Sequence, residues 1–173
     1  GGPECDIYVF RNVIDLRKSL HWERPTDAAP EGKFWKGHSV FFMHGSNGLL
    51  HEEAMHFYQN TALLRSIFYA GATYASMQPG VPRRSLNNLF LYEGGLLRPF
   101  AIPNSDRYDL QMDGNLHWHI TQGDKPLAPM MKQARALPMS EASRKGCPDG
   151  QEAHAIIADP KLLSVPWDIH AVN

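Results

Sequence analysis

The stretch from His38 to Pro79 constrains the fold of this chain more than any other. It begins with Val40 to Met43, a short continuous apolar run that is typical of a buried strand. Gly45-Ser-Asn-Gly48 then favours a turn, because these residues tolerate positive φ or cap a helix. Pro79 ends the stretch, since proline cannot continue a helical ladder.

Apolar residues recur at three- and four-residue steps between these two breaks, so they would share one face of a helix. Glu52 and Glu53 fall in the first turns, where the helix dipole favours negative charge. The pattern predicts one long central helix over about residues 49–78. Its apolar half, 62–77, falls short of the roughly 20 residues needed to span a bilayer, so we expect a core helix and no membrane span. The expected face consists of Leu50, Ala54, Phe57, Thr61, Leu64, Phe68, Ala72 and Ala75.

Shorter segments predict strands around this helix. Residues 5–10 are rich in β-branched and aromatic side chains, and the strand they predict can extend through Val13 and Ile14. Asp113-Gly114-Asn115 is the best hairpin signal, between strands expected at 108–112 and 116–121. Alternation in the second strand places Trp118 toward the core and His117 and His119 toward solvent. Further elements are expected at 86–92 (strand or helical turn), 130–137 (short helix) and 153–158 (strand or short helix).

These elements together predict an α+β fold, with a mixed or antiparallel sheet packed on one long central helix. Prolines concentrate in the connections, so we expect long proline-rich loops. The length favours a single domain over residues 1–173, with an extended C-terminal tail over 160–173. No internal repeat is evident from the sequence.

Charge and cysteine content limit the possible partners. With 17 basic and 18 acidic residues, the chain has no general attraction to nucleic acid or anionic lipid. Cys5 and Cys147 are the only cysteines, and they can be two thiols or one bridge. Neither the compartment nor the localisation follows from them. The Gly-Gly-Pro start without methionine favours a processed, trimmed or tagged product, from which any targeting segment would already be gone.

Nine histidines, about twice the ordinary usage, suggest sites that carry chemistry. His51 and His56 lie five residues apart, so they do not form the zinc helix motif, which needs a spacing of four. Glu53 and His56 match one half of a carboxylate-bridged di-iron site, and Glu52 with His56 forms a possible acid–base pair. A solvated helical turn with an internal hydrogen bond is the explanation that the sequence favours for these residues.

His117-Trp-His119 is the second candidate, because two histidines that alternate along a strand can bind one divalent transition metal. His56 is the expected third ligand. Other possible third ligands are Asp113, Asp124, His44, His51 and Glu53. An exposed sheet face with two polar residues is the alternative explanation.

Two functions are consistent with these features. The first is a non-catalytic binding or accessory subunit, whose proline-rich loops and aromatic-anchored tail (Phe34, Trp35 and Trp167) pack on a partner protein or on a second copy. The alternative is a small metal-dependent or acid–base enzyme, with Glu53 and His56 as catalytic residues and His117, His119 and His56 as metal ligands. The enzyme requires the start of the helix to approach the polar face of the 116–121 strand.

Overall fold

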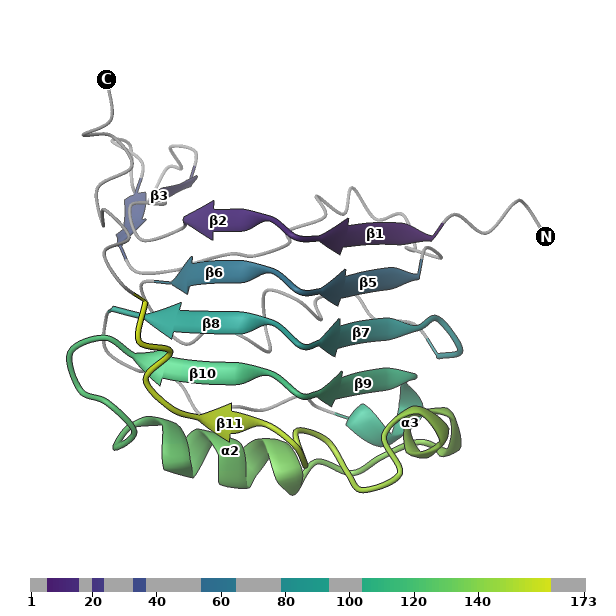
Figure 1. Ribbon diagram of the computed structural model, residues 1–173. Helices are drawn as coiled ribbons and strands as arrows, with labels where there is room; N and C mark the ends of the chain where they lie inside the picture. Colours follow the sequence, from purple (N-terminus) through teal and green to yellow (C-terminus); the bar gives the residue numbers. More distant parts are fainter. Residues whose placement is uncertain are drawn as a thin grey trace.

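The computed structural model describes residues 6–15, 20–23, 33–36, 54–64, 79–93 and 104–162. Two parallel sheets dominate it (Figure 1). The first has the order β1 (Ile7–Phe10), β5 (Met55–Tyr58), β7 (Arg83–Leu86) and β9 (Leu110–Asp113). The second has the order β11 (Ile156–Ile157), β10 (Leu116–His119), β8 (Leu89–Tyr92), β6 (Thr61–Leu64) and β2 (Val13–Asp15). A separate antiparallel pair is formed by β3 (Leu20–Glu23) and β4 (Lys33–Lys36).

Consecutive strands enter different sheets, so each strand–turn–strand unit is one coil of a solenoid. The four coils are β1–β2, β5–β6, β7–β8 and β9–β10, and they stack in register along both sheets (Figure 1). Such stacking buries a continuous core that no single coil can bury alone.

A two-residue turn joins the two strands of every coil. Its first residue has a left-handed backbone, with φ of 56° at Arg11, 56° at Gln59, 55° at Asn87 and 65° at Gly114. Its second residue is asparagine in all four coils. The left-handed residue redirects the chain from the first sheet into the second without a loop.

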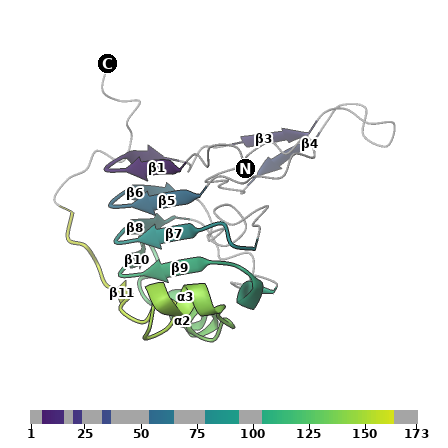
Figure 2. The same cartoon turned by 90° about the vertical axis from the view of Figure 1, so that its right-hand side faces the viewer.

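The core takes side chains from both sheets and extends onto one helix. Phe57, Phe90 and Met112 belong to it from successive coils. Helix α2 (Leu127–Arg135) adds Leu127, Met130, Met131 and Ala134 to this core. The helix and α3 (Glu141–Gly146) lie at the β9–β10 end of the stack (Figure 2). Among the described residues, no helix is long and apolar enough to cross a membrane.

The predicted central helix over 49–78 is wrong over its described part. Residues 54–64 form β5 and β6, with Gln59 and Asn60 as the turn between them. The spacing of Phe57, Thr61 and Leu64 imitates a helical face because the left-handed turn shifts the alternation of the two strands. The α+β fold with a sheet packed on that helix is therefore replaced by a parallel solenoid.

The predicted hairpin at Asp113-Gly114-Asn115 is also wrong. Gly114 does have positive φ, but β9 and β10 continue in the same direction into different sheets and do not pair. The expected orientation in β10 is reversed as well: His117 and His119 are fully buried, whereas Trp118 is only partly buried. Gly114 is the left-handed residue of the turn between β9 and β10, and the coil that they form buries the imidazoles of His117 and His119.

Other sequence predictions have mixed outcomes. The strand expected at 5–10 is confirmed over Ile7–Phe10, and the helix expected at 130–137 is found over Leu127–Arg135. Cys147 carries a free, buried thiol, and burial raises the pKa of this thiol to about 11. Cys5, the strand expected at 40–43 and the tail beyond residue 162 lie outside the described residues.

Candidate functional site

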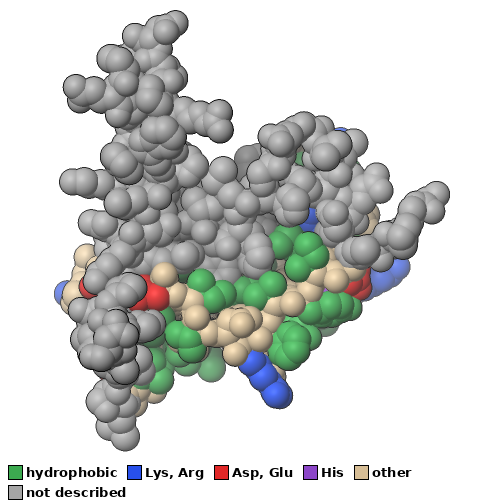
Figure 3. All heavy atoms as spheres, turned by 90° about the horizontal axis from the view of Figure 1, so that it is seen from above, with side chains coloured by type: hydrophobic (Ala, Val, Ile, Leu, Met, Phe, Trp, Pro, Cys, Tyr) green, Lys and Arg blue, Asp and Glu red, His purple; other side chains and the backbone are tan. Residues whose placement is uncertain are grey.

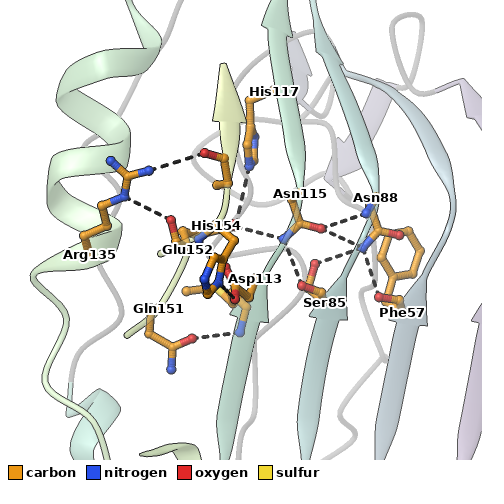
Figure 4. Close-up of polar contacts among 12 residues, drawn as sticks. Phe57, Ser85, Asn88, Asp113, Asn115, His117, Arg135, Gln151, Glu152 and His154 are labelled. Atoms are coloured by element: carbon orange, nitrogen blue, oxygen red, sulfur yellow. Dashed lines mark hydrogen bonds and ion pairs between the residues drawn. The ribbon is translucent and has the colours of Figure 1, made fainter. Parts of the chain in front are cut away.

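The turn asparagines of the four coils form one continuous hydrogen-bonded row, which we call the asparagine ladder (Asn12, Asn60, Asn88 and Asn115). Asn60 Oδ1 accepts from the backbone N–H and the side-chain Nδ2 of Asn12, at 3.1 and 3.2 Å. Asn88 Oδ1 accepts the same two bonds from Asn60, at 3.0 and 3.1 Å. Asn115 Oδ1 accepts them from Asn88, at 2.9 and 3.1 Å. All donors therefore point toward the β9–β10 end, and Figure 4 shows the step from Asn88 to Asn115.

The ladder ends on a buried glutamate. Asn115 Nδ2 donates to Glu152 Oε1 at 2.9 Å, and Glu152 takes a positive φ of 52° like the turn residues of the coils. Its carboxylate is fully buried and also lies 3.5 Å from His117 Nε2. Glu152 thus stands where a fifth asparagine would lie.

Residues 140–157 hydrogen-bond to the backbone groups on the outer edge of β9 and β10. We call this edge the closed edge. The side-chain amide of Gln151 makes the hydrogen bonds that a neighbouring strand would make there. Its Nε2 donates to Leu110 O at 2.6 Å, and its Oε1 accepts from Met112 N–H at 2.7 Å. Ser143 Oγ accepts from Leu110 N–H at 2.9 Å, and β11 pairs with β10. Backbone groups that a further strand would have used are therefore occupied (Figure 4).

An ion pair fastens the loop between α3 and β11 (residues 147–155), which we call the closing loop, to the closed edge. His154 Nδ1 lies 2.6 Å from Asp113 Oδ2, and the His154 backbone N–H donates to Asp113 Oδ1 at 2.7 Å. The Asp113 carboxylate raises the pKa of His154, mainly by this hydrogen bond. The pKa of Asp113 is lowered: burial opposes ionisation, but the hydrogen bonds from His154 outweigh it.

The pair makes a pH-dependent contribution to stability. A raised His pKa gives stabilisation that is complete below about pH 6.5 and is lost as the pH rises through the raised value. A lowered Asp pKa gives stabilisation that is lost only as the pH falls through the lowered value, below the ordinary 3.8. We expect the urea midpoint of wild type to exceed that of His154→Gln most between about pH 4 and 6.5, and the difference to shrink toward pH 8.5. A difference that stays constant up to that pH would contradict this assignment.

His117 and His119 lie inside the coil and not on an exposed face. The His117 ring stacks between Phe90 and Tyr92, with centroids 5.2 and 6.1 Å away, and its Nδ1 lies 2.9 Å from Tyr92 Oη. His119 Nδ1 accepts from the backbone N–H of Gln122 at 3.2 Å. His117 therefore contacts a phenol and a carboxylate, and His119 contacts a tight turn.

His56 lies on the other sheet, among different groups. It is buried on the outer face of β5 beneath the Tyr8 ring, with centroids 4.5 Å apart. Its Nδ1 lies 3.4 Å from Arg84 Nη1, and its Nε2 lies 3.5 Å from Asp6 Oδ2. Burial, and then the Arg84 charge, lower the pKa of His56. A pocket of about 170 Å³ adjoins it, lined by Asp6, Ala54, His56, Gly80, Val81, Pro82 and Arg84.

The chemistry of this pocket is that of a neutral imidazole between a cation and a carboxylate. Because the Arg84 guanidinium can only donate, Nδ1 of His56 accepts and Nε2 carries the proton. Asp6 also accepts from the Tyr8 hydroxyl at 2.9 Å. The His56 imidazole can accept or release a proton, but the Tyr8 ring covers one face of it.

The predicted metal site is not assembled by the residues that the structure describes. His56 contacts neither His117 nor His119, and no group of three His, Cys, Asp or Glu side chains in the described ranges could hold a metal ion. Glu53, His44 and His51 lie outside those ranges. The site therefore stays a prediction for any geometry that involves them.

The outer edge of β1 and β2 contrasts with the closed edge, and we call it the open edge. Of the strands described, none pairs with it. Val13, Tyr8 and Phe10 are 65, 53 and 47% exposed there. Looking down on this edge, Figure 3 shows hydrophobic side chains and backbone at the surface. No described residue donates a hydrogen bond to Asn12 Oδ1.

Within the described ranges, the fold and its edges define a parallel β-solenoid with one closed edge and one edge with which no described strand pairs. The chain matches no known family model, no curated protein and no solved structure. Its function must therefore be argued from its own geometry.

Sequence reasoning missed the asparagine ladder, although a signal for it exists. Each asparagine follows a four-residue strand and one left-handed residue, and the last three are 28 and 27 residues apart. The first interval is 48 residues, because it contains an insertion with β3 and β4. That irregular first interval conceals the repeat.

Proposed function

We propose that this chain is a non-catalytic binding or accessory subunit that contacts a partner protein through its first coil, β1–β2. One observation carries the proposal. Five large hydrophobic residues are exposed among those described, and Tyr8, Phe10 and Val13 of this one coil are three of them. Exposed apolar groups concentrated on one element mark interaction sites, whereas single ones need no explanation.

The character of the open edge supports a protein partner. Aromatic side chains are enriched at the energetic centres of protein interfaces. Tyr8 and Phe10 are held ready for contact because their rings stack on His56 and Tyr58, at 4.5 and 5.4 Å. Residues 6–15 contain no lysine and no proline, which natural proteins place on edge strands to prevent pairing.

The loops and the tail expected to contact the partner lie outside the described side chains. Phe34, Trp35 and Trp167 therefore stay sequence predictions. The proposal moves the centre of the interface from these residues to the first coil.

A matched pair of photo-crosslinking positions tests the proposal. Val13 and Ile156 lie at opposite ends of one in-register column of the second sheet, and they are 65 and 54% exposed. We expect a benzophenone side chain at position 13 to capture a discrete polypeptide in native cells, and one at position 156 to capture none. Complex formation with the purified captured polypeptide should fall at least about tenfold in Phe10→Asp. Equal capture at both positions, or no capture at position 13, would contradict the proposal.

An acid–base enzyme is a second candidate, favoured by the buried neutral His56 beside the pocket. It predicts turnover with some member of a panel of ester, glycoside and peptide substrates. That turnover should be lost in His56→Asn and kept in Tyr58→Leu, a change on the same strand outside the pocket lining. An activity that survives His56→Asn would remove this candidate.

A further inference from the structure

The two edges of the solenoid differ in a way that specifies what can bind the open edge. We propose that the open edge accepts one more coil of the same design from a partner polypeptide, running parallel to β1 and β2. This inference rests on the proposed function, because the coil is the partner's contact segment. The partner coil would place an asparagine in the ladder next to Asn12.

The polarity of the ladder carries this proposal. Each of the last three coils receives, at its asparagine Oδ1, two N–H donors from the coil before it, and each of the first three coils donates two to the coil after it. Asn12 donates to Asn60 but receives no donor from the described residues. The missing element is therefore a backbone N–H and a side-chain amide at one defined position.

The backbone of the first coil indicates the same orientation. Thr61 N–H donates to Asn12 O, Leu89 N–H to Asn60 O and Leu116 N–H to Asn88 O, each at 2.8 Å. Along a strand, the backbone N–H and C=O groups of successive residues point to opposite sides. Ile7 N–H donates to Ala54 O, so the backbone N–H and C=O groups of Tyr8 and Phe10 point away from β5. A parallel strand in register would satisfy these groups and cover the exposed flanks of both rings.

A second copy of this chain cannot supply such a coil. Parallel stacking would bring the open edge of one copy against the closed edge of another, where Gln151, Ser143 and β11 already occupy the strand groups. Two open edges related by a two-fold axis would pair antiparallel. In that arrangement no asparagine of the second copy would lie in register to donate to Asn12 Oδ1. The occupant is therefore a different segment, with a left-handed turn residue followed by asparagine.

A peptide with the coil sequence of residues 6–15 is the probe, because it carries the strand, the turn and the asparagine in the required order. Isotope-labelled protein is titrated with this peptide bearing a nitroxide at its N-terminus. We expect saturable binding, with the strongest broadening at the amides of Ile7 and Tyr8. Strongest broadening near Asp15 would show antiparallel addition and would overturn the proposal.

Three variants test the role of the ladder. Asn12→Ala removes the acceptor and should weaken peptide binding roughly five- to tenfold, the loss expected for one or two hydrogen bonds. Asn12→Asp keeps an acceptor oxygen but loses the Nδ2 donor to Asn60 Oδ1 and Phe10 O, so its binding should fall between that of Asn12→Ala and that of wild type. Asn104→Ala alters an exposed turn asparagine, also with positive φ, elsewhere and should change nothing. Equal binding to wild type and Asn12→Ala, or no binding at all, would overturn coil addition.

These outcomes separate the mode of binding from the function. If position 13 captures a partner but the peptide fails to bind, the chain is a binding subunit with another contact mode. If the peptide binds but position 13 captures nothing, the edge is competent and the proposed cellular function is wrong.

Discussion

Replacing Asn88 with alanine should lower the free energy of unfolding by about 3–5 kcal/mol, since each buried group left without its partner costs about 1–3 kcal/mol. Asn88 lies in the middle of the asparagine ladder and is almost fully buried. Its side chain accepts from Asn60 and donates to Asn115 Oδ1 at 3.1 Å and to Phe57 O at 3.0 Å. Alanine would leave the Asn60 backbone N–H without its acceptor and would remove a donor from Phe57 O and from Asn115 Oδ1, in the two neighbouring coils.

Urea denaturation of Asn88→Ala measures this loss, and two variants serve as references. Asn104→Ala, at an exposed turn with no side-chain cap bond, should cost no more than about 1 kcal/mol, because its positive φ of 54° disfavours alanine. Asn12→Ala, at the open edge, should fall between the two, because only its donors are engaged. If Asn88→Ala were no more destabilising than Asn104→Ala, the ladder would not hold the coils together.

Replacing Gln151 with alanine should destabilise the protein by about 2–4 kcal/mol and also change its association state. The substitution removes both hydrogen bonds that Gln151 makes to the edge of β9, and it leaves Leu110 O and Met112 N–H unpaired. An unprotected strand edge is a template for pairing with another chain. We therefore expect the variant to form head-to-tail oligomers, in which the open edge of one copy meets the exposed edge of the next.

Denaturation and analytical ultracentrifugation measure the two effects separately. Gln122→Ala alters an exposed glutamine whose side chain is remote from β9, and it should change neither. Gln151→Ala combined with Asn12→Ala should reduce the oligomers, since the open edge then lacks its acceptor. A Gln151→Ala protein that is destabilised but stays monomeric would show that the closing loop alone protects this edge.

The sequence predicted strands better than it predicted their assembly. Residues 5–10 and 116–121 have alternating or β-branched patterns, and both contain strands of the solenoid. The central segment failed because Gln59 adopts a left-handed backbone that glutamine rarely takes. Stacking of the flanking coils stabilises that conformation through Asn60, and such a tertiary effect is not visible in local periodicity.

The candidate site shows the same limit. His56, His117 and His119 were identified from their chemistry, but the solenoid places His56 on one sheet and the other two inside the second. The expected His-out orientation was wrong because the coil interior accepts these imidazoles when Tyr92 hydrogen-bonds His117 and the backbone N–H of Gln122 hydrogen-bonds His119. Asn12, Asn60, Asn88 and Asn115 were missed because an asparagine next to a turn is common, and only their register makes them a ladder.

Backbone amide exchange of the isolated protein, followed by NMR, tests most directly that the chain is a ladder-stacked solenoid with one open edge. The account predicts strong protection at Asn60, Asn88 and Leu89, whose N–H groups donate within the stack at 3.0, 2.9 and 2.8 Å. It predicts rapid exchange at Tyr8 and Phe10, whose N–H groups face away from β5. Protection at Tyr8 and Phe10 equal to that at Asn88, or helical protection running through residues 54–64, would contradict it.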